Sequence, residues 1–159
     1  MLDAKEVSIP FAQHFKLSHE QSPNNKSSMK EMSKIPYSNV VGSLMYSMVC
    51  TRPGLAHSMS VSSRFMAKPG RAHWDAVKWT LRYVNGTLDM SLVYGGAKLG
   101  EEPCILGFSD ADYAADLDRR RSSTGYVFQL WNSTISWKTN LQPVVDPPLR
   151  HNTLLSLKQ

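Results

Sequence analysis

Apolar residues recur at two different spacings along this chain. Between residues 35 and 86 they recur every three or four positions, in three segments separated by Thr51-Arg52-Pro53-Gly54 and by Pro69-Gly70. Apolar residues at this spacing line one face of a helix, and Pro with Gly interrupts helices. The pattern therefore predicts three helices with short breaks, which together form a small helical subdomain.

The third segment gives the clearest helical pattern. Trp74, Val77 and Leu81 fall on one apolar face, and Asn85-Gly86 marks the end of the segment. Trp74 is therefore expected in the core rather than stacked on a nucleic-acid base. Trp79 lies off this face, so it could rest on a neighbouring helix or sheet.

After Gly86 the spacing changes to short runs of β-forming residues, bounded by residues typical of turns. These runs are Leu92–Tyr94, Cys104–Phe108, Thr124–Leu130 and Thr134–Lys138. The link between the last two runs is short and contains Asn132, which suits a hairpin. The chain is therefore predicted to be α+β, with the helical subdomain followed by a sheet.

The two ends of the chain differ from its middle. Residues 1–34 are polar and contain Pro10 and Pro23, so we expect an extended arm or linker with little core of its own. Residues 146–159 contain two adjacent prolines and show no clear period. The sequence is thus divided into an arm (1–34), a helical segment (35–87), a sheet segment (88–145) and a tail (146–159).

Composition narrows the class of protein. Apolar residues make up 42% of the 159, enough for a core, and the net charge of +5 is compatible with nucleic acid without pointing to it specifically. Cys50 and Cys104 lack any Cys-x-x-Cys spacing, which excludes a disulfide-dense scaffold or zinc module.

The N-terminal MLDAKEVSIPFAQHF has no long apolar core, and no run reaches membrane-spanning length. We expect an intracellular protein, cytoplasmic or nuclear, without a signal peptide or membrane segment.

Two long stretches carry a family resemblance: KIPYSNVVGSLMYSMVCTRPGLAHSMSVSSRFMAKPGRAHWDAVKWTLRYVNGT and GFSDADYAADLDRRRSSTGYVFQLWNSTISWKTNLQPVV. The first resembles the helical connection after the reverse transcriptase palm in the Pol polyprotein of copia-type retrotransposons. The second resembles the start of the ribonuclease H domain in the same polyprotein. The resemblance covers residues 2–145 and implies the first three strands of a ribonuclease H-like antiparallel sheet.

The resemblance also implies what the parent polyprotein does. Its activities are RNA-directed DNA synthesis and hydrolysis of RNA–DNA hybrids, with Mg²⁺ as the cofactor and an RNA–DNA hybrid as the partner. This chain departs from the family pattern, most plainly in two places. It contains no Tyr-x-Asp-Asp polymerase motif, and Val145 is followed by Asp146-Pro147-Pro148 where the family has a helix with Thr-Glu-Ala-Glu-Tyr. We therefore expect a truncated Pol fragment that is catalytically inactive alone and binds no cofactor.

Four aspartates lie close together between Asp110 and Asp118. By resemblance, Asp110 is the first metal-binding carboxylate of a ribonuclease H centre, and Asp112 faces the same way if the strand continues. Two-metal hydrolysis needs several converging carboxylates, so we expect these two to be a vestigial metal site. Asp116 and Asp118 are expected in a turn with local, exposed ion pairs to the arginines that follow.

Basic residues suggest a second hypothesis, a non-catalytic nucleic-acid-binding remnant. Arg119, Arg120 and Arg121 could contact phosphates, or could form a charged surface turn. Lys78 and Arg82 lie together on the third predicted helix and could add to such a surface.

Two weaker expectations concern other partners. The chain could be an interaction or effector protein repurposed from the fragment; at the position where the family can carry an Arg-x-Leu-Arg tetrapeptide, this chain has Trp79-Thr80-Leu81-Arg82. A partial sheet also exposes an apolar face and strand edges, which favours self-association, although the leucines of the tail could cover part of that face.

Overall fold

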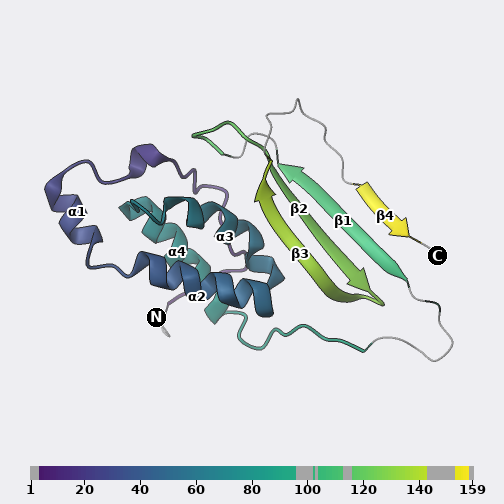
Figure 1. The fold of residues 1–159 in the computed structure, drawn as a ribbon. Helices are drawn as coiled ribbons and strands as arrows, with labels where there is room; N and C mark the ends of the chain where they lie inside the picture. Colours follow the sequence, from purple (N-terminus) through teal and green to yellow (C-terminus); the bar gives the residue numbers. More distant parts are fainter. Residues whose placement is uncertain (1–3, 96–101, 103, 113–115, 143–152, 158–159) are drawn as a thin grey trace. The chain divides into compact units, whose positions relative to one another are not determined.

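The computed structural model describes residues 4–95, 102, 104–112, 116–142 and 153–157. The chain forms two compact units, Met1–Met90 and Ser91–Gln159. The first unit is helical and the second is a sheet, so the fold is α+β as the sequence predicts (Figure 1).

The three predicted helices are present in the first unit. They are α2 (Tyr37–Cys50), α3 (Ala56–Ser62) and α4 (Arg71–Asn85). α2 ends where Thr51-Arg52-Pro53-Gly54 begins, and a 3-10 turn, Pro53–Leu55, leads directly into α3. The main core lies between these helices and contains Tyr37, Val41, Leu44, Leu55, Met59 and Val77. Trp74 packs against this core, as its place on the apolar face predicts.

The N-terminal segment is more structured than an extended arm. It contains a 3-10 turn at His19–Gln21 and a short helix, α1 (Lys26–Met32), which begins where the Asn25 side chain accepts the Ser28 N–H at 2.7 Å. It also contributes to a second core, in which Leu17 is buried with Phe65 and Ala76. The arm's apolar residues pack on a neighbouring helix rather than along a helix of their own, so they leave no period in the sequence.

A glycine lets the arm approach α4 closely. Gly70 precedes the first residue of α4, and a Cβ at this position would lie 1.9 Å from the carbonyl oxygen of Gln21. No side chain fits in that space. The beginning of α4 therefore holds the arm only because residue 70 is glycine.

The second unit is a four-stranded sheet in the order β3-β2-β1-β4, with antiparallel neighbours throughout. Its strands are β1 (Ile105–Asp112), β2 (Ser123–Leu130), β3 (Ser133–Leu141) and β4 (Thr153–Leu157). β2 and β3 form the predicted hairpin. Its two turn residues, Trp131 and Asn132, have φ angles of 45° and 62°, the left-handed geometry that two-residue hairpin turns prefer.

The sheet differs from the sequence pattern in two respects. Leu92–Tyr94 forms no strand, because three apolar residues make a strand only where a neighbour offers backbone hydrogen bonds. The tail, in contrast, contributes β4, whose residues pair with β1 from Ile105↔Leu157 to Ser109↔Thr153. The tail therefore extends the sheet at an edge, and its remaining residues, 146–152 and 158–159, lie outside the described part of the chain.

Candidate functional site: a carboxylate pair and an arginine loop

Asp110 and Asp112 lie at the end of β1. The strand continues through Asp112, so the two carboxylates, two residues apart, stand on the same side of the sheet. Both are exposed, and their partners across β2 are the small residues Gly125 and Ser123. One oxygen of Asp110, Oδ1, accepts the backbone N–H of Ala111 at 2.8 Å. The pair is thus accessible, with one oxygen engaged by the backbone.

This pair by itself does not fit a two-metal centre. Among the residues that the structure describes, no group of three or more His, Cys, Asp or Glu side chains could hold a metal ion. Two ions about 3.5–4 Å apart require more carboxylate oxygens than two side chains on one strand can supply. The sequence after Asp118 has one further acidic side chain, Asp146, which lies outside the described residues.

The structure corrects the expected role of Asp116. Its side chain is only 5% exposed, where the sequence suggested an exposed ion pair. Its Oδ1 accepts the backbone N–H groups of Asp118 and Arg119 at 3.0 and 3.2 Å. An aspartate that bonds the backbone two and three residues on closes a turn. Asp116 therefore builds the loop that carries the arginines.

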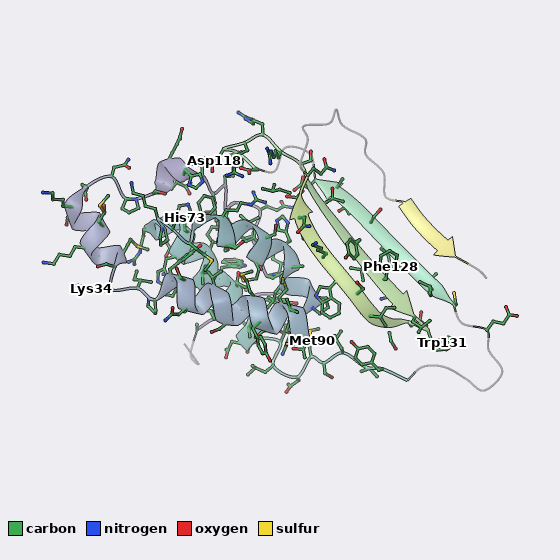
Figure 2. The ribbon with its side chains drawn as sticks, in the orientation of Figure 1. Lys34, His73, Met90, Asp118, Phe128 and Trp131 are labelled. Carbon is green, nitrogen blue, oxygen red and sulfur yellow. The ribbon has the colours of Figure 1, made fainter. Side chains whose placement is uncertain are left out.

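Backbone bonds complete this loop, which we call the arginine loop (residues 116–121). The Asp116 N–H donates to the Arg121 carbonyl at 3.1 Å, and the Arg120 N–H donates to the Asp116 carbonyl at 2.8 Å. Arg120 has a φ of 55°, a left-handed conformation that is uncommon outside glycine. Arg119 and Arg120 are exposed, and Arg121 is half-buried. Figure 2 labels Asp118, the exposed acidic residue of this loop.

Lys78 and Arg82 of α4 have interaction partners within the helical unit itself. Lys78 Nζ lies 2.7 Å from a carboxylate oxygen of Asp75. The Arg82 guanidinium lies 5.0 Å from the centre of the Trp79 ring and donates to the Lys5 carbonyl. Trp79 donates its indole N–H to the carbonyl of Ile9 at 2.9 Å. Trp79 therefore rests on the arm, rather than on the sheet or helix that the sequence left open.

His73 was not among the site residues that the sequence predicted. It is fully buried at the third position of α4, and both of its ring nitrogens are within hydrogen-bond distance of backbone atoms. The only sequence signal is a histidine three residues after Gly70, the place from which a side chain reaches back to the start of a helix. That signal is too common to have identified the residue.

None of the helices in the described residues is long and apolar enough to cross a membrane.

Comparison with known proteins identifies the family. Over 145 residues the chain is 50% identical to the retrovirus-related Pol polyprotein from transposon TNT 1-94 of Nicotiana tabacum, covering 91% of this chain and 11% of that protein. It is 36% identical over 142 residues to the Pol polyprotein from transposon RE2 of Arabidopsis thaliana, covering 89% of this chain and 9% of that protein. The chain belongs to the Pol polyproteins of copia-type retrotransposons. This Pol chain corresponds to a fragment, because it spans about a tenth of the length of these relatives.

A third relative has a different name. The Pol chain is 42% identical over 114 residues to "Secreted RxLR effector protein 161" of Plasmopara viticola, covering 72% of this chain and 78% of that protein. No protein-family model and no solved structure matches the chain.

Proposed function

We propose that Asp110 and Asp112 are the first two ligands of a ribonuclease H-type metal centre and that this Pol chain hydrolyses no RNA–DNA hybrid by itself. The observation that supports the proposal is the strand itself: β1 continues through Asp112, with both carboxylates exposed on one side. Two such carboxylates can take part in coordinating Mg²⁺, but they cannot position two ions. Hydrolysis would then require carboxylates that this chain does not contribute.

The proposed lack of hydrolysis is tested by incubating the purified chain with a labelled RNA–DNA hybrid and Mg²⁺ or Mn²⁺. We expect no cleavage. Metal-dependent cleavage that disappears in Asp110→Asn would overturn the proposal. Asp118→Asn is the matched control, because Asp118 is also an exposed aspartate but lies in the arginine loop.

Whether Asp110 and Asp112 bind a metal ion must be measured in a way that does not depend on activity. Mn²⁺ broadens the NMR signals of nearby amides, so added Mn²⁺ should broaden those of residues 110–112 first. Asp110→Asn should remove this selectivity and Asp118→Asn should keep it. Uniform broadening along the chain would show that Asp110 and Asp112 are not ligands.

A second candidate function is weak, non-catalytic binding to nucleic acid through the arginine loop, with an RNA–DNA hybrid as the partner. The specific support is the way Asp116 closes the loop while Arg119 and Arg120 stay exposed. A cation on a fixed loop loses less conformational entropy when it meets a phosphate than one on a free chain. Lys78 and Arg82 are weaker candidates, because each already has a partner within the helical unit.

Salt dependence tests this binding. Retention on an RNA–DNA duplex should fall steeply with added salt. The double variant Arg119→Ala/Arg120→Ala should lower the slope of log K against log salt by about 1–2. Lys78→Ala should change the slope less. An absence of salt-dependent binding, or an unchanged slope in the double variant, would rule out the arginine loop as the contact.

The name of the Plasmopara viticola relative raises an effector role, but the chain's own geometry does not favour it. Trp79, Thr80 and Arg82 donate to backbone carbonyls of the arm, and Leu81 packs against the main core. A tetrapeptide with these contacts is part of a packed helix. Its contacts favour a structural role over one as an accessible recognition motif.

A further inference from the structure

The arm lies along α4 and is held there by side chains of α4. Four of them donate hydrogen bonds to backbone carbonyls of residues 5–18. The pairs are His73 to Ser18, Thr80 to Pro10, Trp79 to Ile9 and Arg82 to Lys5. The arm partner changes from Ser18 at His73, near the start of α4, to Lys5 at Arg82, near its end, so the arm as a whole runs antiparallel to the helix. Hydrogen bonds donated by α4 side chains thus hold the arm along the helix.

His73 differs from the other three donors because its bonding depends on protonation. Its Nδ1 lies 2.7 Å from the backbone nitrogen of Gly70, which can only donate a proton. Nδ1 must therefore be the unprotonated nitrogen of a neutral ring, and Nε2–H is then the donor to the Ser18 carbonyl at 3.1 Å. Only this one form of the imidazole satisfies both contacts.

The surroundings of the ring leave it little freedom to adjust. His73 has no exposed surface and stacks on the ring of Phe65, with 4.0 Å between centroids and 13° between planes. A proton added at Nδ1 would direct one N–H at another, that of Gly70. It would also place a cation in the first turn of a 15-residue helix, where the helix dipole disfavours positive charge.

We propose that His73 is an acid-sensitive latch that fastens the arm to α4 at neutral pH and releases it when the imidazole takes up a proton. The sign follows from linkage. The fastened arm requires neutral His73, whereas a released, solvated histidine titrates near pH 6.5. Fastening is therefore complete above about pH 6.5 and weakens as the pH falls, by up to about tenfold for each pH unit.

Other ionisable groups lie on every element that packs around the latch. The arm contributes His19 and Glu20, the turn before α4 contributes Arg64 beside Phe65, and α4 itself contributes Arg71 and Asp75. His19, Glu20 and Arg71 are exposed, so water can solvate their charges. His57 contacts the ring of Phe11, His14 contacts the rings of Phe15 and Trp79, and neither histidine is buried. The fully buried ring of His73 is thus the one among them that water cannot solvate.

Release would change the surface of the helical unit. The arm covers Phe65 and Ala76 through Leu17, and His19 packs edge-on against Phe65 at 5.0 Å. Lifting the arm at Ser18 would expose this second core, while the main core of Tyr37, Leu55 and Met59 contains no arm residue. The expected event is therefore a local opening, with α2, α3 and α4 still folded.

Hydrogen exchange of the full chain, read by mass spectrometry at pH 7.5 and pH 5.5, tests the latch. Rates are corrected for the intrinsic effect of pH with an unstructured reference peptide. Protection of the arm should fall about tenfold at pH 5.5, and that of α2 should not change. The variant His73→Gln should remove this pH dependence, since a glutamine amide offers one acceptor and one donor and does not titrate. His14→Gln is the matched control and should keep it.

Several results would overturn the proposal. Equal arm protection at the two pH values is one, and a pH dependence that persists in His73→Gln is another. NMR of the wild-type imidazole nitrogens gives a test that survives if the variant fails to fold. The proposal requires the neutral Nε2–H form at pH 7.5, and observation of the Nδ1–H form would contradict it.

Discussion

The two units of this chain differ most in what they bury. In the described residues, every buried apolar side chain belongs to the helical unit, and four of these, Val41, Leu55, Ala76 and Val77, are fully inaccessible. The buried side chains of the sheet unit are polar: Asp116, Ser122, Ser123 and Ser133. Phe108 and Ile135 in the sheet remain 40% and 46% exposed.

This difference indicates where each unit obtains its stability. The helical unit has two apolar cores and can gain the hydrophobic free energy that folding requires. The sheet unit relies on backbone pairing between strands and on loop closure by Asp116. Among its described side chains none that is apolar is buried, and strands without a buried apolar face are only marginally stable in water. From these residues we expect the unit that carries the candidate site to be the weaker of the two.

Truncation in the main core should have the largest effect. Leu55→Ala removes a side chain with no exposed surface and should lower the free energy of unfolding by about 2–5 kcal/mol. Urea titration followed by circular dichroism at 222 nm measures this change. Val49→Ala, at an α2 position that is 65% exposed, is the matched control and should cost less than about 0.5 kcal/mol. Equal effects of the two changes would mean that the helical core is not the source of stability.

Removal of the buried hydroxyl of Tyr37 should have the next largest effect on the free energy of unfolding. Tyr37 donates to the Ser62 carbonyl at 2.9 Å, and burial raises the pKa of this phenol well above its usual value. Tyr37→Phe removes this buried hydrogen bond and should cost about 1–3 kcal/mol.

The same residue gives a pH prediction. Below about pH 10 the phenol is protonated in both folded and unfolded states, so its contribution is present in full. Above that pH the unfolded chain ionises first and stability falls as the pH rises. Urea midpoints at pH 8 and pH 11 should therefore converge partly in Tyr37→Phe, and an unchanged difference would contradict the assignment.

Loop closure should matter locally in the sheet unit. Asp116→Ala removes the acceptor of two backbone N–H groups and should destabilise the arginine loop by about 1 kcal/mol, as loss of a helix cap does. The amides of Asp118 and Arg119 should then exchange with solvent about fivefold faster. Asp118→Ala, at an exposed position, is the control. If both variants behaved alike, burial of Asp116 would have no role in holding the loop.

The smallest change in stability should come from the exposed sheet residues. Phe108→Ser should alter the free energy of unfolding by less than about 0.5 kcal/mol. We propose that the exposed sheet promotes self-association, so the same variant should lower the apparent mass in concentrated solution, as measured by light scattering. A larger loss of stability, with no change in association, would instead place Phe108 in a core.

The local pattern of the sequence was sufficient for six of the described helices and strands, but not for α1 or β4. Helical spacing predicted α2, α3 and α4, and β-forming runs predicted β1, β2 and β3 with their hairpin, because these signals depend on residues close together in the chain. The family resemblance likewise depended on local words of sequence, and the relatives confirm it. The same information identified Asp110 and Asp112, but their role as ligands stays a prediction.

Tertiary structure decided what depends on contacts between distant residues. β4 forms by pairing with the edge of β1. The residues Thr153–Leu157 alone show no alternation of apolar and polar positions that would predict a strand. Asp116 is buried and closes the loop where the sequence predicted an exposed residue, since burial cannot be read from a charged run. The bonds from α4 to the arm, including that of His73 to Ser18, join residues 55–77 positions apart. Such contacts have no local signature, because the backbone carbonyl that accepts each bond is the same in every residue.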